Sequence, residues 1–162
     1  MKETEEKVGR LLKQGGATIS VAESCTGGLI AHRITNVSGS SDYFESGIVA
    51  YSNQAKVELL EVPQTLIDRY GPVSEPVAKA MAERIREKSK TTVGLGTTGV
   101  AGPLGGTSKT PVGTVFIAFA GPNSSVVRRF HFTGKRTQIK RLATETALRM
   151  VLEYFGSHGK GA

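Results

Sequence analysis

The segment AESCTGG, residues 22–28, is the clearest indication of fold class in this chain of 162 residues. It follows the apolar run ATISV at residues 17–21. An apolar run that ends in small polar residues and glycines is typical of a buried strand that turns into a helix. We therefore predict a strand over residues 17–22 and a helix over residues 25–35.

The rest of the chain continues this alternation of strand and helix. Apolar stretches bounded by turn residues predict strands over residues 43–51, 93–98, 112–120 and 126–132, the last two paired as a hairpin. Helical periodicity predicts helices over residues 4–14, 53–61, 75–89 and 135–155, with a turn region from Pro63 to Pro72. The alternation predicts one α/β domain over residues 1–155, with a mixed sheet and helices on both faces. We expect residues 156–162 to form a disordered tail.

The composition argues against several classes of protein. One cysteine and three histidines provide neither a disulfide framework nor the ligand spacing of a zinc site. Residues 1–10 are charged and lack the apolar segment of a signal peptide. No apolar run approaches the roughly 18 residues of a membrane-spanning helix. We expect a cytoplasmic protein without a metal, a cofactor or a membrane partner.

Positive charge gathers in one part of the chain. The net charge is +7, and no acidic residue lies between Glu87 and Glu145. The cations of that segment are Lys88, Lys90, Lys109, Arg128, Arg129, Lys135, Arg136, Lys140 and Arg141. A field of one sign favours an anionic partner, such as a small phosphorylated ligand. Nucleic acid is disfavoured, because aromatic residues make up only 6% and no nucleic-acid-binding motif is present. The alternative is a basic face that confers solubility.

A glycine-rich segment follows the strand predicted to begin at Val93. Gly94, Gly96 and Gly99 match G-x-G-x-x-G, but a dinucleotide site needs a helix that begins at the third glycine and an acidic residue about 20 positions later. Neither follows here, so we reject that site. The glycines can still bring backbone amides close to a ligand, or they can simply form a turn.

A lysine lies where a helix should begin. Ser52 or Asn53 is a suitable N-cap, which places Lys56 in the first helical turn. The helix dipole and partial burial there favour the neutral amine, which can act as a general base. The alternative is an exposed lysine on the surface. Tyr51 can bridge a serine and this lysine, position a substrate, or be an ordinary aromatic residue at the end of a strand.

Two residues of AESCTGG are possible nucleophiles. Cys25 lacks a base, because His32 would lie about 10 Å away along the same helix and nothing places His131 nearby. Cys25 is better explained as a small packed residue. Ser24 can direct its hydroxyl into the crevice at the end of the strand, or it can cap the helix. The residues alone leave this choice open.

Five stretches together resemble the CinA C-terminal domain family, over about residues 5–155. They are AESCTGGLIAHRIT, GSSDYFESGIVAYSNQAK, GPVSEPVAKAMAE, TTGVAGPLGGTSKTPVGTV and the final GKR…IKR helix. The resemblance implies a three-layer α/β/α sandwich and a homodimer or larger homo-oligomer. The resemblance is to stand-alone members, which are nicotinamide mononucleotide amidohydrolases without the N-terminal domain of longer members. They produce nicotinate mononucleotide and ammonia in pyridine nucleotide salvage.

The resemblance also implies the roles of individual residues. It assigns Ser24 as the nucleophile, with Tyr51 and Lys56 as its activating partners. The predicted substrate-binding residues are Thr26, Gly27, Ser41, Thr98, Gly99, Gly102, Arg136 and Arg141. Among these, Arg136 and Arg141, together with Lys140, are candidates for a 5′-phosphate near the start of the last helix. The chain departs from the family at Val100, where many members have isoleucine, and at Leu104, where a small or acidic residue is common.

The resulting hypothesis is amide hydrolysis by acyl transfer. Backbone amides near Thr98 and Gly99, or at the start of the helix after Ser24, would stabilise the oxyanion. Two alternatives remain at this point. One is a nucleotide-binding or competence-related regulatory module without turnover, and the other is nucleic-acid binding through the basic face.

Overall fold

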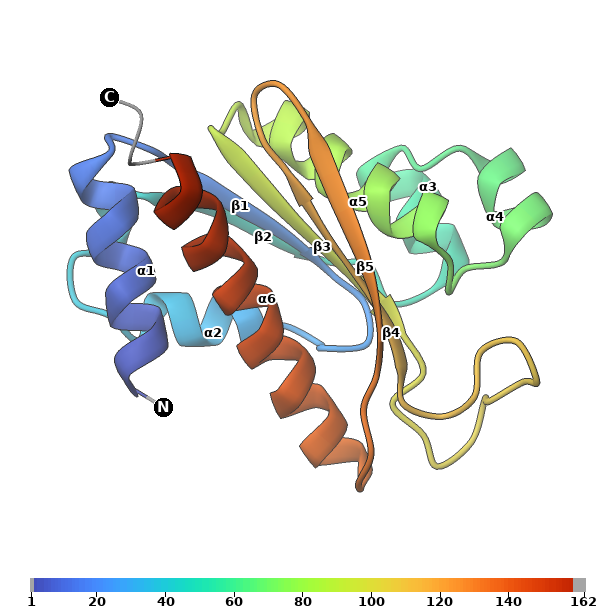
Figure 1. Ribbon diagram of the computed structural model, residues 1–162. Coiled ribbons are helices and arrows are strands. Elements are labelled where there is room, and N and C mark those ends of the chain that lie inside the picture. The colour runs from blue at the N-terminus through green and yellow to red at the C-terminus, as the bar shows by residue number, and fades with distance from the viewer. Residues whose placement is uncertain (1, 159–162) are drawn as a thin grey trace.

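The computed structural model describes residues 2–158 and contains one mixed sheet of five strands (Figure 1). The strands are β1 (Ile19–Glu23), β2 (Phe44–Val49), β3 (Val93–Gly99), β4 (Thr114–Ala120) and β5 (Ser125–His131). Their order across the sheet is β2-β1-β3-β4-β5. β1 is parallel to both β2 and β3, whereas β4 is antiparallel to β3 and to β5.

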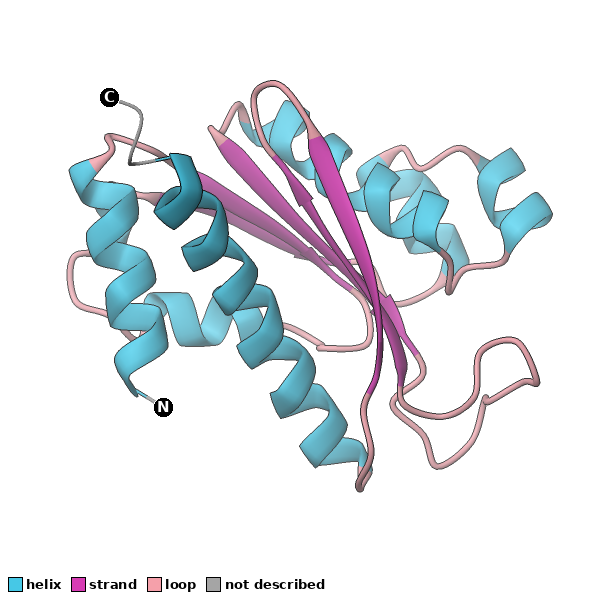
Figure 2. Ribbon diagram, viewed as in Figure 1, coloured by secondary structure: helices cyan, strands magenta, loops and turns pink. Residues whose placement is uncertain are grey.

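Helices cover both faces of this sheet (Figure 2). One face carries α1 (Lys2–Gln14), α2 (Leu29–Thr35) and α6 (Arg136–His158), and the other carries α3 (Asn53–Leu60), α4 (Gln64–Tyr70) and α5 (Glu75–Ser89). A short 3-10 helix, η1 (Ser40–Asp42), precedes β2. The predicted α/β/α sandwich is therefore confirmed.

The burial of the central strands explains their composition. All seven residues of β4 are buried, as expected for a strand covered by helices on both faces. In β3, Gly94 and Gly96 face α5, and an added Cβ would lie 2.4 Å from the Ala82 carbonyl oxygen and 2.7 Å from that of Ala78. These two glycines therefore belong to a tight strand–helix contact and not to a ligand-binding loop.

Some predicted boundaries were wrong. α2 begins at Leu29 because residues 24–28 form a turn, so the predicted start at residue 25 was too early. The predicted turn region between Pro63 and Pro72 contains α4, whose start has no side-chain cap. α6 continues to His158, so residues 156–158 are helical and are not a disordered tail, and residues 159–162 lie outside the described part. The predicted hairpin of β4 and β5 is confirmed, with Gly121 N–H bonded to Ser124 O at 2.9 Å.

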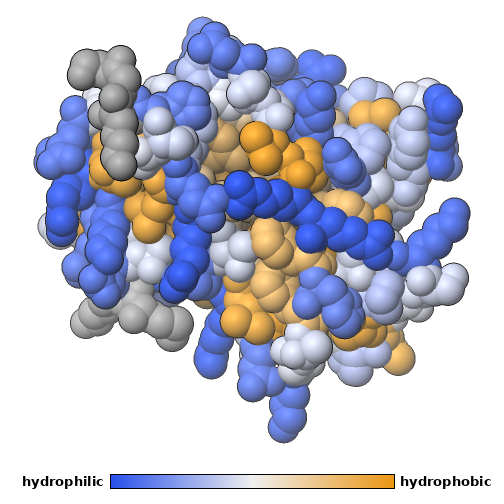
Figure 3. Space-filling model, in the orientation of Figure 1, coloured by the Kyte–Doolittle hydropathy of each residue, from blue (hydrophilic) through white to orange (hydrophobic). Residues whose placement is uncertain are grey.

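Hydrophilic and apolar side chains share the face of the molecule that is seen in the orientation of Figure 1 (Figure 3). In the orientation of Figure 1, long hydrophilic side chains cross apolar surface between α6 and β5 (Figure 3). The ion pair between Arg128 and Glu153, at 2.6 Å, joins β5 to α6. No helix in the described part of the chain is long and apolar enough to cross a lipid bilayer.

Candidate active site

A pocket of about 270 Å³ lies beyond the carboxyl ends of the three parallel strands β1, β2 and β3. Such a crevice is the usual ligand site of an open α/β sheet. The turn after β1, the start of α3, the loop after β3 and the start of α6 all contribute to it. Its lining is Ser24, Cys25, Tyr51, Asn53, Lys56, Pro72, Val73, Thr98, Gly99, Val100, Ala101, Gly102, Leu104, Gly105 and Arg136.

Ser24 lies at the point where β1 ends and the chain turns. Its amide donates to Thr97 O at 3.0 Å, which continues the pairing of β1 with β3 for one residue. The chain then reverses, with Gly27 N–H bonded to Ser24 O and with positive φ angles of 60° at Gly27 and 98° at Gly28. Glycine adopts such angles readily. The N-cap of α2 is Gly28, so the alternative of Ser24 as a helix cap is wrong.

Lys56 of α3 reaches Ser24 within the pocket. Ser52 caps α3, as predicted, and accepts a hydrogen bond from Ala55 N–H at 3.0 Å. The Lys56 side chain runs inward, with 2% of the residue exposed, and its Nζ donates to Ser24 Oγ at 3.0 Å. The alternative of a lysine on the surface is therefore wrong. Burial lowers the pKa of Lys56, because desolvation disfavours the ammonium form.

Cys25 borders the same pocket but has a different environment. Only 6% of the residue is exposed, and it packs in the hydrophobic core. Burial raises the pKa of its thiol to about 12, and a protonated thiol is a poor nucleophile. Neither candidate base approaches it, since His32 contacts Asn36 and His131 contacts Val112 O.

Tyr51 lies at the mouth of the pocket and contacts Arg136. Its hydroxyl accepts a hydrogen bond from the Arg136 guanidinium at 2.8 Å, and 59% of the residue is exposed. Arg136 also donates to Gly102 O at 2.7 Å. The predicted bridge of Tyr51 between Ser24 and Lys56 is therefore not formed in this structure. Instead, Arg136 connects the start of α6 to Tyr51, which follows β2, and to Gly102 in the loop after β3.

Several residues predicted to bind substrate do line the pocket. Thr98 and Gly99 at the end of β3 and Gly102 in the following loop form one wall, and Arg136 forms part of the rim. The Thr98 hydroxyl donates to Pro72 O at 2.8 Å, which ties this wall to the segment before α5. Pro72, which was predicted only as the end of a turn region, also borders the pocket.

The remaining predicted residues lie elsewhere. Ser41 is exposed in η1, before β2, whereas the pocket lies beyond the other end of that strand. A strand of this length spans about 20 Å, so Ser41 is not at the site. Arg141 is exposed and does not border the pocket. Lys140 is closer, because a Cβ added at Gly27 would lie 3.3 Å from its Nζ.

Thr26 is buried behind the turn and does not face the pocket. Its hydroxyl lies 2.9 Å from Thr97 Oγ1 and donates to Glu23 Oε1 at 2.7 Å. Sequence reasoning missed Glu23. The signal was an acidic residue at the end of an otherwise apolar strand, where only a charge with partners can be buried.

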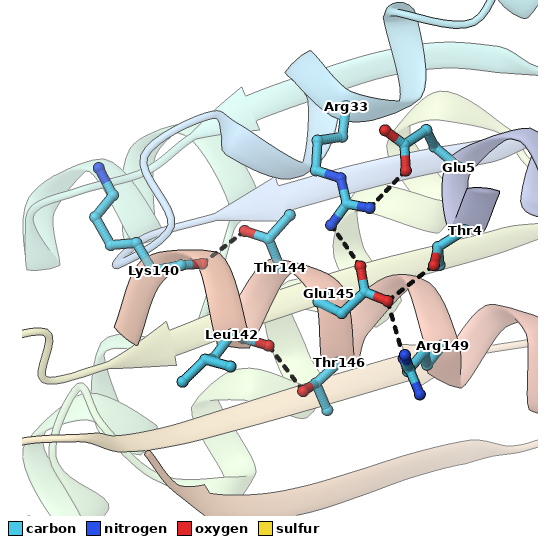
Figure 4. Close-up of polar contacts among 9 residues, drawn as sticks. All are labelled: Thr4, Glu5, Arg33, Lys140, Leu142, Thr144, Glu145, Thr146 and Arg149. Carbon is cyan, nitrogen blue, oxygen red and sulfur yellow. Dashed lines mark hydrogen bonds and ion pairs between the residues drawn. The ribbon is translucent and has the colours of Figure 1, made fainter. Parts of the chain in front are cut away.

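A cluster of ion pairs joins the helices behind the turn (Figure 4). Arg33 of α2 pairs with Glu5 of α1 and, at 2.7 Å, with Glu145 of α6. Glu145 also accepts hydrogen bonds from Thr4 and Arg149. Burial alone would raise the pKa of Glu145, but the hydrogen bonds from Arg149, Arg33 and Thr4 outweigh it and lower the pKa to about 2. Among residues 2–158, no group of His, Cys, Asp or Glu side chains is arranged to bind a metal ion.

Known proteins resemble the chain in sequence. The model of the CinA C-terminal domain family matches residues 1–155. A CinA-like protein from Geotalea daltonii is 54% identical over 141 residues, which cover 87% of this chain and 34% of that protein. One from Syntrophus aciditrophicus is 48% identical over 154 residues, which cover 94% of this chain and 37% of that protein. The chain thus spans about a third of the length of these curated relatives.

Solved structures resemble the chain in fold. A competence-damaged protein (CinA) superfamily protein from Klebsiella pneumoniae superimposes with a TM-score of 0.93 at 28% identity, covering 96% of this chain and 98% of that one. A competence/damage-inducible protein from Agrobacterium tumefaciens gives a TM-score of 0.88 at 35% identity, covering 93% of this chain and 94% of that one.

Proposed function

This chain belongs to the CinA C-terminal domain family, and on that premise we propose that it hydrolyses the carboxamide of nicotinamide mononucleotide. The products are nicotinate mononucleotide and ammonia, as the sequence resemblance implies. One observation carries the proposal: the buried amine of Lys56 lies 3.0 Å from the hydroxyl of Ser24 at the inner end of a pocket. A serine paired with a lysine of lowered pKa suits acyl transfer.

Proton transfer between Ser24 and Lys56 accounts for both halves of the reaction. As Ser24 Oγ attacks the carboxamide carbon, the neutral Lys56 amine takes the hydroxyl proton. The ammonium then gives that proton to the departing nitrogen, and ammonia leaves an ester on Ser24. A water molecule attacks the ester with Lys56 again as the base, which releases the carboxylate and restores the serine.

The geometry of β3 supplies a candidate donor for the oxyanion. Thr97 O accepts from Ser24 N–H, so Thr97 directs its backbone groups toward β1. Gly99, two residues later, directs its N–H the same way, because alternate residues of a strand share an edge. β1 has ended at Glu23 by that level. The Gly99 amide therefore points at the space beside Ser24, where charge would develop on the carboxamide oxygen.

The rim of the pocket suits the rest of the substrate. Arg136 is well placed to bind a phosphate, since guanidinium groups form bidentate contacts with its oxygens. Val73, Val100 and Leu104 provide apolar surface for a pyridine ring. Lys140, beside Gly27, adds a second cation near the start of α6.

Ammonia release tests this proposal and its substrate together. We expect rapid release from nicotinamide mononucleotide, and much slower release from nicotinamide riboside and free nicotinamide, which lack the phosphate. Ser24→Ala should release none. Tight binding of nicotinamide mononucleotide without any ammonia would instead favour the regulatory module. Equal rates on all three compounds would contradict the assigned role of the basic rim.

A further inference from the structure

Glu23 is a buried acid that the proposed reaction does not use. It is the last residue of β1, and 1% of it is exposed. Its Oε1 accepts from Thr26 Oγ1 at 2.7 Å and from Ile30 N–H at 2.9 Å, and its Oε2 accepts from Ala31 N–H at 3.1 Å. All three partners donate, so both carboxylate oxygens are satisfied.

These hydrogen bonds span the turn that carries Ser24. Glu23 lies immediately before the turn of residues 24–28, and Ile30 and Ala31 lie just after it, in the first turn of α2. The amides of a first helical turn have no partner within the helix, and α2 has no side-chain cap at Gly28. The carboxylate of Glu23, at the end of β1, accepts the hydrogen bonds of two of these amides. The helix dipole favours a negative charge at this position. One side chain thus fixes both ends of the turn.

Thr26 secures the middle of the same turn. Its hydroxyl donates to Glu23 and also contacts the hydroxyl of Thr97 on β3. The turn is therefore attached to β3 through Thr26 as well as through the Ser24 amide. The path from Glu23 through Thr26 to Thr97 is buried along its whole length, so water cannot replace these contacts.

We propose that Glu23 is the positioning residue of the nucleophile. Ser24 and Lys56 come from different elements, and their contact requires the turn to present the hydroxyl within a few tenths of an ångström. Glu23 and Thr26 fix the turn in that position, and neither residue lines the pocket. This inference rests on Ser24 as the nucleophile of the proposed function but does not depend on the substrate.

Three substitutions test this role. Glu23→Gln retains the shape but replaces one carboxylate oxygen by an NH2 group, which cannot accept a hydrogen bond from a donor of the turn or of α2. We expect kcat to fall by about 10- to 100-fold, the loss typical of a nucleophile displaced by up to an ångström, with KM within about threefold because the pocket is unchanged. Thr26→Val, which removes the hydroxyl at similar volume, should lower kcat in the same way. Thr26→Ser retains the hydroxyl and should keep nearly the full kcat.

A reagent that reacts with Ser24 directly tests the positioning role of Glu23 without any assumption about the substrate. The rate of sulfonylation of Ser24 by phenylmethanesulfonyl fluoride, followed by mass spectrometry with Ser24→Ala as the blank, should fall in Glu23→Gln and Thr26→Val but not in Thr26→Ser. Wild-type rates of sulfonylation and wild-type kcat in folded Glu23→Gln or Thr26→Val protein would overturn the inference.

The two proposals can fail separately. If wild-type protein is sulfonylated at Ser24 but releases no ammonia from nicotinamide mononucleotide, the proposed substrate is wrong. The order of sulfonylation rates among the variants still decides the role of Glu23. If Glu23→Gln does not fold, the comparison of Thr26→Val with Thr26→Ser gives the answer, because both variants keep the carboxylate and its bonds to α2.

Discussion

At the residue scale, the contact between Ser24 and Lys56 requires the lysine side chain to point into the protein and not into solvent. A lysine in the first turn of a helix could equally have been exposed, and the residues alone left both possibilities open. The structure places its amine on the Ser24 hydroxyl. By contrast, no local pattern could show that Ser41 lies at the opposite end of β2, or that Thr26 faces inward, because both depend on the paths of distant elements.

Lys56→Met should change activity and stability in opposite directions. Loss of the general base should lower kcat by about 10²- to 10⁴-fold. The folded state lowers the pKa of Lys56 from its usual 10.5, so at neutral pH the unfolded chain binds a proton that the folded chain disfavours. The free energy of unfolding therefore rises with pH up to about 10.5 as far as Lys56 determines it. Methionine carries no charge, so Lys56→Met removes the cost of burying the ammonium group. We expect Lys56→Met to melt at a higher temperature than wild type at pH 7.

The exposed Lys79 of α5 provides the control. Lys79→Met should leave both kcat and the melting temperature close to wild type. A Lys56→Met protein with normal kcat would show that the amine is not the base.

Tyr51→Phe tests whether the tyrosine transfers protons or contacts the substrate. Its hydroxyl bonds to Arg136 and is largely exposed, so we expect KM to rise several-fold while kcat stays within about threefold, as for the loss of uniform binding. Steady-state kinetics on nicotinamide mononucleotide measure both. A fall in kcat of about 100-fold with unchanged KM would instead support the activating role that the family resemblance implies.

At the scale of elements, the alternation of strands and helices could be predicted because buried apolar residues recur with strand or helix periodicity. The continuous apolar run of β4 and the capped start of α3 are local signals, and both were predicted correctly. α4 was missed because its start has no side-chain cap and it has only seven residues. The late start of α2 was missed because its first amides are capped by Glu23, a residue outside the helix.

Gly96→Ala should destabilise the contact between β3 and α5. The added methyl group would lie 2.7 Å from Ala78 O and from Ala82 N, which are both backbone atoms that cannot move aside. We expect a loss of about 1–3 kcal/mol in the free energy of unfolding, typical of an overpacked core, measured by urea denaturation. Gly156→Ala in α6 is the matched control, because a Cβ added there meets no atom within 4 Å apart from its own stretch of helix backbone. It should stabilise the protein by about 0.5–1 kcal/mol through helix propensity. Equal effects of the two substitutions would contradict the packing argument.

At the scale of the whole molecule, ion pairs connect α1, α2 and α6, the three helices on one face of the sheet. Arg33 lies in α2, which follows the turn of residues 24–28, and Glu145 lies on the helix that begins at Arg136. Sequence reasoning could not predict this cluster, because its contacts join residues that are distant in the chain, such as Thr4 and Glu145, which are 141 positions apart. The homo-oligomer, the cytoplasmic location and the single domain over residues 1–155 stay predictions.

The cluster predicts sensitivity to acid. The folded pKa of Glu145, about 2, lies below its ordinary value of 4.5, and the pKa of Glu5 is lowered as well. Stability from these groups is present above pH 4.5 and is lost as the pH falls toward 2. Urea denaturation between pH 6 and pH 3 should show this loss in wild type and a smaller one in Glu145→Gln. Glu6→Gln, which removes an exposed carboxylate of α1 outside the cluster, should follow the wild-type curve. A Glu145→Gln curve parallel to wild type would contradict the assignment.

In the proposed reaction Ser24, and not the neighbouring Cys25, attacks the amide. The most direct test is intact-protein mass spectrometry of enzyme quenched in acid during turnover of nicotinamide mononucleotide. We predict an ester adduct with the mass of the nicotinate mononucleotide acyl group on wild-type and Cys25→Ala protein, and neither adduct nor ammonia release with Ser24→Ala. Ammonia release by Ser24→Ala at the wild-type rate would contradict the account.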